Sequence, residues 1–326
     1  MDRPRLATDI MVTRLVTLAP ETHVTEGISY LLRHNISGAP VVDGDRNYLG
    51  VFSEKCCLNV LSVTSKLVRS RSETKRQTQL AKKFMATRLI TLTPEMDVFE
   101  AIGYLLKHRI SGAPVIRPDR TFLGVFSEKT SMQVLVDSAY DQLPTSRVGA
   151  FMNTDSKRLI SDDTDLLAVM KIFLDTPYRR LPVLRDGKLI GQVSRRDALR
   201  AQNHVARYLN PEEKDHAILK LSFPSDHKDH DTESPASHLP SLEVASFMDC
   251  EACTVSTDTD LLSIAHIFLS TPYRRLPVLD EVKLVGQISR RDVLQATHDV
   301  MAVPRQLKGN LLYLSSLVER SESPIG

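Results

Sequence analysis

The sequence predicts an α/β (α+β) fold made of four repeats that pack in pairs. Residues 176–199 and 271–294 are near-copies, identical at 18 of 24 aligned positions. Residues 36–55 and 110–129 form a second pair, identical at 15 of 20 positions. A proline, a glycine and a serine line up across all four copies. Because a unit of about 55 residues is too small to bury a core alone, we expect the repeats to pack in twos.

Each repeat has the predicted order strand, helix, strand, strand, helix. In the first repeat, 15–18 indicates a short strand, and apolar residues recur at helical spacing over 24–34. The apolar segments 39–42 and 48–52 flank an Asp-Gly turn and predict a hairpin. Ser53 then has the position of a helix cap. With the same order in every copy, the four repeats span 1–65, 82–138, 148–203 and 244–300.

Four segments lie outside the repeats, and one of them is the short connector 140–147, which Pro144 interrupts. The basic stretch 66–83 lacks the interleaved aromatic residues of a nucleic-acid patch, so it is interpreted as a solvated connector. Residues 204–243 are rich in Asp, His, Ser and Pro and predict a flexible insertion. Residues 301–326 form a tail with one apolar patch.

Composition narrows the class of protein. The formal net charge of +2 gives no strong electrostatic case for binding nucleic acid or an anionic membrane. No apolar run approaches the roughly 20 residues of a membrane span, and the first residues lack a signal peptide's apolar segment. These features, and the cysteine pattern that follows, predict a reduced, cytoplasmic protein. The four cysteines are too few and too irregularly placed for a disulfide framework: Cys56, Cys57, Cys250 and Cys253.

The β-α-β-β-α order, with LPV or APV in the middle strand and G-x-x-S-x-x-D at the end of the last, resembles the CBS domain, named for cystathionine β-synthase. The resemblance implies that motifs pack in twos into Bateman modules, motif 1 with motif 2 and motif 3 with motif 4. It also implies that two modules associate through their helices into a pseudo-symmetric disk, and that the protein self-associates through its CBS modules. The layout is similar to that of the gamma subunit of AMP-activated protein kinase.

Two Ser-x-x-Asp sequences are candidate sites, Ser194 with Asp197 and Ser289 with Asp292. One interpretation is a capping box, in which the serine and the acidic residue satisfy backbone groups of the first helical turn. The other is a nucleotide site, because a helix start attracts phosphate and a carboxylate can accept both hydroxyls of a ribose. The family resemblance, which implies adenosine-nucleotide binding, favours the second role alongside the first.

Arginines flank both candidate sites. Arg180 and Arg275 come just before an apolar strand, and Arg196 and Arg291 follow the serines. Their forked donors suit phosphate, although side chains lying exposed over the sheet fit the same pattern. Repeats 1 and 2 depart from this pattern. Cys56 and Thr130 replace the two aspartates, and Ser-Gly replaces each Arg-Arg pair, at 37–38 and 111–112, although His108-Arg109 resembles a phosphate-contacting pair.

These observations predict a non-catalytic regulatory protein. It would bind AMP, ADP or ATP between motifs 3 and 4 and transmit this to an unidentified regulated partner. The N-terminal pair would be mainly structural or partner-binding. The alternative is an interaction scaffold of CBS modules without nucleotide sensing. A thiol or metal enzyme built on Cys250-x-x-Cys253 and the histidines of the insertion is the weakest hypothesis, because the second ligand pair of a zinc site is missing.

Overall fold

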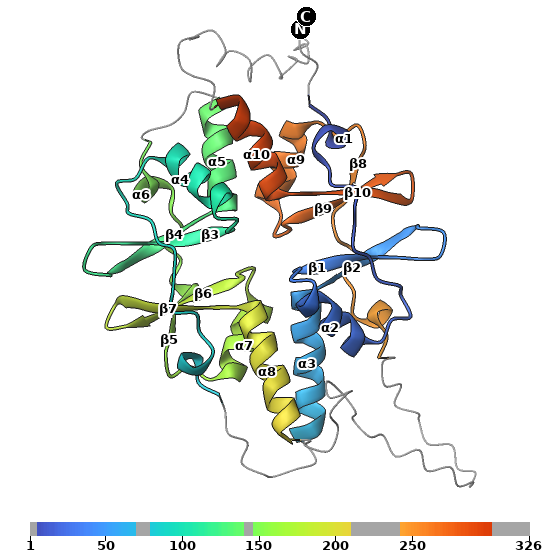
Figure 1. Ribbon diagram of the computed structural model, residues 1–326, viewed down its shortest axis with the longest axis horizontal. Helices are drawn as coiled ribbons and strands as arrows, with labels where there is room; N and C mark the ends of the chain where they lie inside the picture. The colour runs from blue at the N-terminus through green and yellow to red at the C-terminus, as the bar shows by residue number, and fades with distance from the viewer. Residues whose placement is uncertain (1–4, 70–78, 140–145, 210–241, 302–326) are drawn as a thin grey trace, which may run out of the picture.

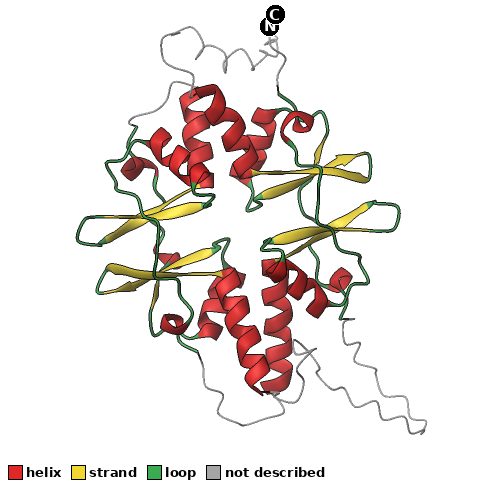
Figure 2. Cartoon of the chain, viewed as in Figure 1, coloured by secondary structure: helices red, strands yellow, loops and turns green. Residues whose placement is uncertain are grey.

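The computed structural model describes residues 5–69, 79–139, 146–209 and 242–301. Four similar units surround a common centre in a disk, with strands toward the two sides and helices at the two ends (Figures 1 and 2). This confirms the predicted α+β class and the disk. The predicted insertion and tail lie almost entirely outside the described residues. In the part of the chain that the structure describes, no helix is long and apolar enough to cross a membrane.

Every repeat contains one two-stranded hairpin between two helices. Repeat 1 comprises α1 (Ala7–Ile10), α2 (Val24–Arg33), β1 (Gly38–Val42), β2 (Tyr48–Ser53) and α3 (Glu54–Arg69). Repeat 2 comprises η1 (Ala81–Lys83), α4 (Val98–Lys107), β3 (Gly112–Ile116), β4 (Phe122–Ser127) and α5 (Glu128–Ala139).

Repeats 3 and 4 carry an additional short strand. Repeat 3 comprises α6 (Val148–Phe151), η2 (Ser156–Arg158), β5 (Ile160–Ser161), α7 (Leu166–Asp175), β6 (Arg180–Arg185), β7 (Lys188–Ser194) and α8 (Arg195–Leu209). Repeat 4 comprises η3 (Val244–Ser246), β8 (Val255–Ser256), α9 (Leu261–Ser270), β9 (Arg275–Asp280), β10 (Lys283–Ser289) and α10 (Arg290–Met301).

The first predicted strand of repeats 1 and 2 is shorter than expected. At 15–18 and 89–92 the structure has a single parallel bridge each, Leu18 to Val41 and Leu92 to Val115. Pro20 and Pro94 follow two residues later, and a proline has no N–H with which to continue the ladder.

The first segment of each repeat forms an arm that crosses to a different repeat. The arm at 6–12 bonds to repeat 4, where Ala7 N donates to Thr259 O over 2.8 Å. The arm at 243–249 returns to repeat 1, where Val244 N donates to Thr22 O over 2.8 Å. The arms at 80–86 and 147–153 connect repeats 2 and 3 in the same way, with bridges Ala86 to Gln192 and Val125 to Asn153. Repeats 1 and 4 therefore form one module, and repeats 2 and 3 form the other.

The helices join the modules to each other. Helix α3 of repeat 1 packs on α7 and α8 of repeat 3, and α5 of repeat 2 packs on α9 and α10 of repeat 4. Each of the two apolar cores is accordingly shared by two modules. One contains Phe52 and Leu58 with Phe173 and Leu181, and the other contains Phe126 and its neighbours with Phe268.

The predicted pairing of repeat 1 with repeat 2 and of repeat 3 with repeat 4 is therefore wrong. Repeats that follow one another as 1 and 2, or as 3 and 4, lie diagonally across the disk (Figure 1). The exchanged arms decide the pairing, because in the described chain their backbone bridges to other repeats join repeat 1 with repeat 4 and repeat 2 with repeat 3.

The aligned glycine of the second hairpin strand has a role in this exchange. A Cβ at Gly50 would lie 2.7 Å from the carbonyl oxygen of Asp249, and one at Gly124 would lie 2.9 Å from that of Asn153. In repeats 3 and 4, Gly191 and Gly286 face a methionine of the arm. At Gly50 and Gly124, glycine lets the backbone of the arm lie this close to the strand.

Candidate functional site

Both Ser-x-x-Asp sequences adopt the capping geometry. At the start of α8, Asp197 Oδ2 accepts from Ser194 N at 2.9 Å and from Ser194 Oγ at 2.6 Å. At the start of α10, Asp292 Oδ2 accepts from Ser289 N and Oγ, both at 2.7 Å. Because each aspartate uses only Oδ2 among its described contacts, a second carboxylate oxygen remains for another donor.

The arginine preceding each apolar strand faces its Ser-x-x-Asp across the hairpin. Arg180 is the register partner of Ser194, and Arg275 is the register partner of Ser289. Both guanidinium groups donate to a serine of the other repeat in their module, Arg180 to Ser111 and Arg275 to Ser37 at 3.1 Å. The guanidinium groups are thus held in place by neutral hydroxyl groups rather than by carboxylates.

Two glutamates hold the remaining arginines across the boundary between the modules. Glu54 Oε2 lies 3.1 Å from Arg179 Nη2, and its Oε1 lies 3.1 Å from Arg196 Nη2. Glu128 accepts from Arg274 Nε at 3.1 Å, and its Oε1 lies 3.8 Å from Arg291 Nη2. Glu54 and Glu128 are only 6% and 3% exposed. Each carboxylate therefore lies between two guanidinium groups of the repeat that packs on it through helices.

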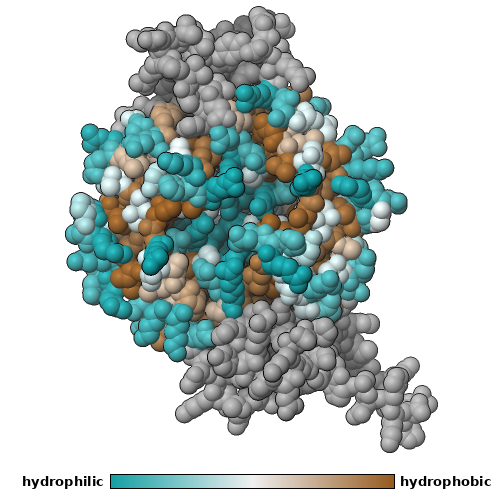
Figure 3. Space-filling view, viewed as in Figure 1, coloured by the Kyte–Doolittle hydropathy of each residue, from teal (hydrophilic) through white to brown (hydrophobic). Residues whose placement is uncertain are grey.

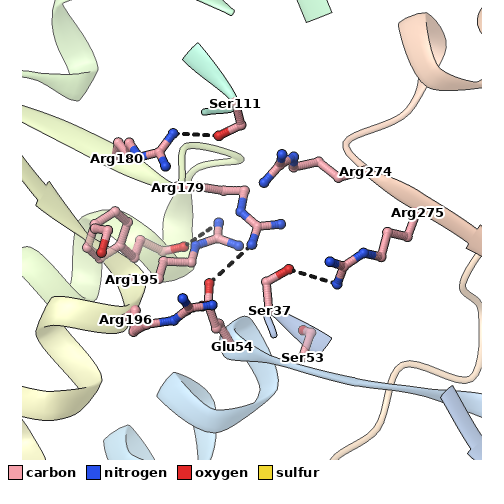
Figure 4. A network of polar contacts seen from close by, with 12 residues as sticks. Ser37, Ser53, Glu54, Ser111, Arg179, Arg180, Arg195, Arg196, Arg274 and Arg275 are labelled. Carbon is pink, nitrogen blue, oxygen red and sulfur yellow. Dashed lines mark hydrogen bonds and ion pairs between the residues drawn. The ribbon is translucent and has the colours of Figure 1, made fainter. Parts of the chain in front are cut away.

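These side chains meet at the centre of the disk. The arginine cluster comprises Arg179, Arg180, Arg196, Arg274, Arg275 and Arg291 (Figure 4 labels five of the six). Hydrophilic side chains also surround a hollow at the centre of the face shown in Figure 3. Six guanidinium groups here face four carboxylates, those of Glu54, Glu128, Asp197 and Asp292. The described centre therefore keeps a net positive charge.

Burial and the crowding of positive charge lower the pKa of several arginines in the cluster. Loss of hydration, followed by the charge of Arg274, lowers the pKa of Arg179 to about 9. The same two causes lower the pKa of Arg180 and of Arg275. An anion placed among these groups would relieve their repulsion.

Comparison with known proteins identifies the family of the repeats. The family model of the CBS domain matches residues 7–63, 81–130, 148–204 and 244–299, well over half of the chain. This chain belongs to the CBS domain family. The four-repeat arrangement is thus a set of four CBS motifs in two Bateman modules, which confirms the resemblance stated from the sequence.

Individual relatives differ in how much of the chain they match. The protein MJ1225 of Methanocaldococcus jannaschii is 21% identical over 289 residues, which cover 86% of this chain and 95% of that protein. CBSX1 of Arabidopsis thaliana is 31% identical over 145 residues, covering 36% of this chain and 61% of that protein. A crystal structure of CBSX2 in complex with AMP is 30% identical, covers 39% of this chain and 97% of that chain, and has a TM-score of 0.35.

The other arginine after each serine has a structural role. Arg195 donates from Nη2 to Phe173 O and Thr176 O, and Arg290 does the same to Phe268 O and Thr271 O. These carbonyls belong to the last turns of α7 and α9, so both arginines cap helix C-termini. Of the four arginines that follow the serines, only Arg196 and Arg291 belong to the arginine cluster.

The degenerate positions of CBS motifs 1 and 2 act as caps. Cys56 Sγ lies 3.2 Å from Ser53 Oγ, and burial raises the pKa of the Cys56 thiol, which keeps it in the neutral form. Thr130 Oγ1 donates to Ser127 O at 2.7 Å. His108 and Arg109 are both exposed, with Arg109 in a left-handed conformation (φ 53°).

The sequence-based site omitted Arg179, Arg274, Glu54 and Glu128. A signal for the two glutamates was present, since Glu54 and Glu128 align with Arg195 and Arg290 in the other two motifs. Such an inversion of charge at one repeat position indicates a contact between unlike repeats.

The cysteines and histidines form no further site in the described chain. Within the described ranges, no group of three or more His, Cys, Asp or Glu side chains could hold a metal ion. Cys250 is exposed and Cys253 is partly buried, and both are free thiols.

Proposed function

We propose that this CBS protein is a non-catalytic sensor of phosphorylated adenosine that signals to a partner protein. The observation that carries the proposal is the arginine cluster beside two Ser-x-x-Asp helix starts, which together offer phosphate donors and a ribose acceptor. Asp197 or Asp292 would accept from the ribose hydroxyls through its unused oxygen. Arg180 or Arg275, across the hairpin, would hold the first phosphate.

The two proposed sites lie in different modules. The sequence-based hypothesis placed one site between motifs 3 and 4, but motif 3 is in the module with motif 2 and motif 4 is in the module with motif 1. Each module then has one complete Ser-x-x-Asp and one degenerate copy, at Thr130 or Cys56. We expect one nucleotide in each module, with the phosphates directed toward the shared centre.

The charge of the site favours phosphorylated ligands. A sulfonium cation such as that of S-adenosylmethionine would be repelled by the arginines, whereas AMP, ADP and ATP would be attracted. Calorimetric titration of the full chain with these four ligands tests the proposal. Tighter binding of S-adenosylmethionine than of all three nucleotides would contradict it.

A scaffold of CBS modules without nucleotide sensing is the second candidate. It is favoured by the capping boxes and the glutamate–arginine contacts, both of which are complete without a ligand. The same titration separates the two functions, because a scaffold would bind none of the nucleotides. For a sensor, nucleotide binding shifts an equilibrium between two conformations of the protein. The free energy of this shift equals the difference in nucleotide-binding free energy between the two conformations.

A further inference from the structure

The two glutamates at the module boundary use the same donors that a phosphate would use. Glu54 engages Arg196 through Nε at 3.2 Å and through Nη2 at 3.1 Å, which is a side-on contact with the guanidinium fork. Arginine forks bind carboxylate and phosphate oxygens in the same geometry. A fork that holds Glu54 or Glu128 is therefore not available to a ligand until the glutamate moves.

The arginines of the cluster thus differ in how strongly they are already engaged. Arg180 and Arg275 have hydroxyl partners, Ser111 and Ser37, which a phosphate can displace at little electrostatic cost. Arg179 and Arg274 have nearly buried carboxylate partners. A ligand that enters from the Ser-x-x-Asp side meets the hydroxyl-paired arginine first, because Arg180 and Arg275 lie directly across the hairpin from Ser194 and Ser289.

The carboxylates also oppose additional phosphates directly. A second or third phosphate directed toward the centre would meet Glu54 or Glu128 as a like charge, and both carboxylates are nearly buried. Binding there requires displacing a carboxylate from two arginines, so each added phosphate gains less than the first.

We propose that Glu54 and Glu128 are specificity-determining counter-ions that limit how many phosphates a bound nucleotide can place among the arginines. The inference rests on the proposed function and specifies it: the sites discriminate against triphosphates, and a polyphosphate that does bind separates contacts that join the two modules. Glu54 acts on the Asp197 site, since it holds Arg179 and Arg196 of motif 3. Glu128 acts on the Asp292 site through Arg274 and Arg291 of motif 4.

The test replaces each carboxylate by a neutral amide of the same shape. Full-length Glu54→Gln and Glu128→Gln are titrated by calorimetry with AMP, ATP and inorganic tripolyphosphate. The matched controls are Glu21→Gln in motif 1 and Glu95→Gln in motif 2. These two glutamates are exposed and occupy similar positions in the turn before α2 and before α4. We expect both test variants to bind ATP and tripolyphosphate about ten- to a hundredfold more tightly than the wild type, with AMP changing by less than about threefold, and we expect the controls to be unchanged.

The outcomes separate this inference from the proposed function. If wild-type protein binds no nucleotide, the proposed function fails. The affinity of wild type and of the glutamine variants for tripolyphosphate still tests the role of the two glutamates. Unchanged or weaker binding of both ATP and tripolyphosphate in a folded variant overturns the inference, whatever AMP does. Should Glu54→Gln not fold, Glu54→Asp keeps the charge but withdraws the carboxylate by one methylene, and an intermediate gain for tripolyphosphate is then expected. No gain in that variant overturns the inference as well.

Discussion

Arg179 of CBS motif 3 lies 3.1 Å from the carboxylate of Glu54 in CBS motif 1. The contact joins two modules and is repeated by Arg274 and Glu128 on the other side of the disk. Motif 1 packs on motif 3, and motif 2 packs on motif 4, through their helices. In both cases a glutamate of the first motif contacts arginines of the second. Packing of motif 3 on motif 4 would instead bring arginines together, so the charges favour contacts between unlike motifs.

Removing a ribose acceptor should strongly weaken nucleotide binding in one module. A charge-assisted hydrogen bond contributes about 1.5–3 kcal/mol, so losing two in Asp197→Ala should weaken binding there by roughly a hundred- to several-thousandfold. The same loss is expected at the other site for Asp292→Ala. Calorimetry that resolves the two sites measures the effect.

The control for this experiment is Thr130→Ala, which removes a helix cap of the same position from motif 2. It should lower stability by about 1 kcal/mol without changing nucleotide affinity. If Asp197→Ala behaves in the same way, the aspartate is only a cap.

Adding one methyl group under an arm should destabilise a module. In Gly50→Ala the new Cβ would lie 2.7 Å from a backbone oxygen of Asp249, so the arm must shift, at a cost of about 1–3 kcal/mol. Gly44→Ala is the matched control in the same hairpin, because a Cβ there has no atom within 4 Å. Denaturant unfolding of both variants provides the comparison, and equal midpoints would show that the arm is not held against the strand.

Stabilisation by an anion should weaken at alkaline pH. Loss of hydration and the nearby Arg274 lower the pKa of Arg179 from its ordinary value to about 9. Because the folded-state value lies below the unfolded one, the charged side chain destabilises the fold at neutral pH, and this penalty falls as pH rises through about 9.

A bound anion offsets the penalty only while Arg179 is charged. The rise in Tm caused by tripolyphosphate should therefore be larger at about pH 8 than at about pH 10. In Arg179→Gln the difference between the two conditions should shrink. A wild-type shift that grows with pH would contradict the assignment.

A fragment that contains motifs 2 and 3 should fold without the rest of the chain. Residues 79–209 include both exchanged arms of that module and all of its strands. The apolar faces of α5 and α8 would be exposed in this fragment, so we expect a dimer in which Glu128 of one copy meets Arg179 of the other. Circular dichroism and light scattering test this, with the fragment 1–140 as comparison. That fragment holds motifs 1 and 2, which share no module, and a cooperative unfolding transition in it would count against the arm exchange.

Local features of this protein were predictable from its sequence. The hairpins follow from apolar runs around a polar turn, and the caps at Ser194 and Ser289 follow from the spacing of two residues within one helical turn. The pairing of motifs was not predictable in this way. It depends on contacts such as Leu6 with Asp260, which are far apart in the sequence and leave no periodic pattern.

The central site was predicted in part for the same reason. Arg180 and Arg275 were identified because they precede a strand beside a Ser-x-x-Asp. Glu54 and Glu128 were missed, because their role depends on which motif lies opposite each helix start. The partners that a side chain meets across the disk come from the tertiary arrangement, and a single sequence does not specify them.

The arm exchange gives the chain a nested order. Motifs 2 and 3, which are consecutive in the sequence, form one module, and motifs 1 and 4, which flank them, form the other. During synthesis, the inner module can therefore be completed while motif 1 still lacks motif 4, which is synthesised after the other three motifs. Meanwhile α7 and α8 of motif 3 can already pack on α3. Motif 3 thus has a second role, because it shelters the first part of the chain until the final motif arrives.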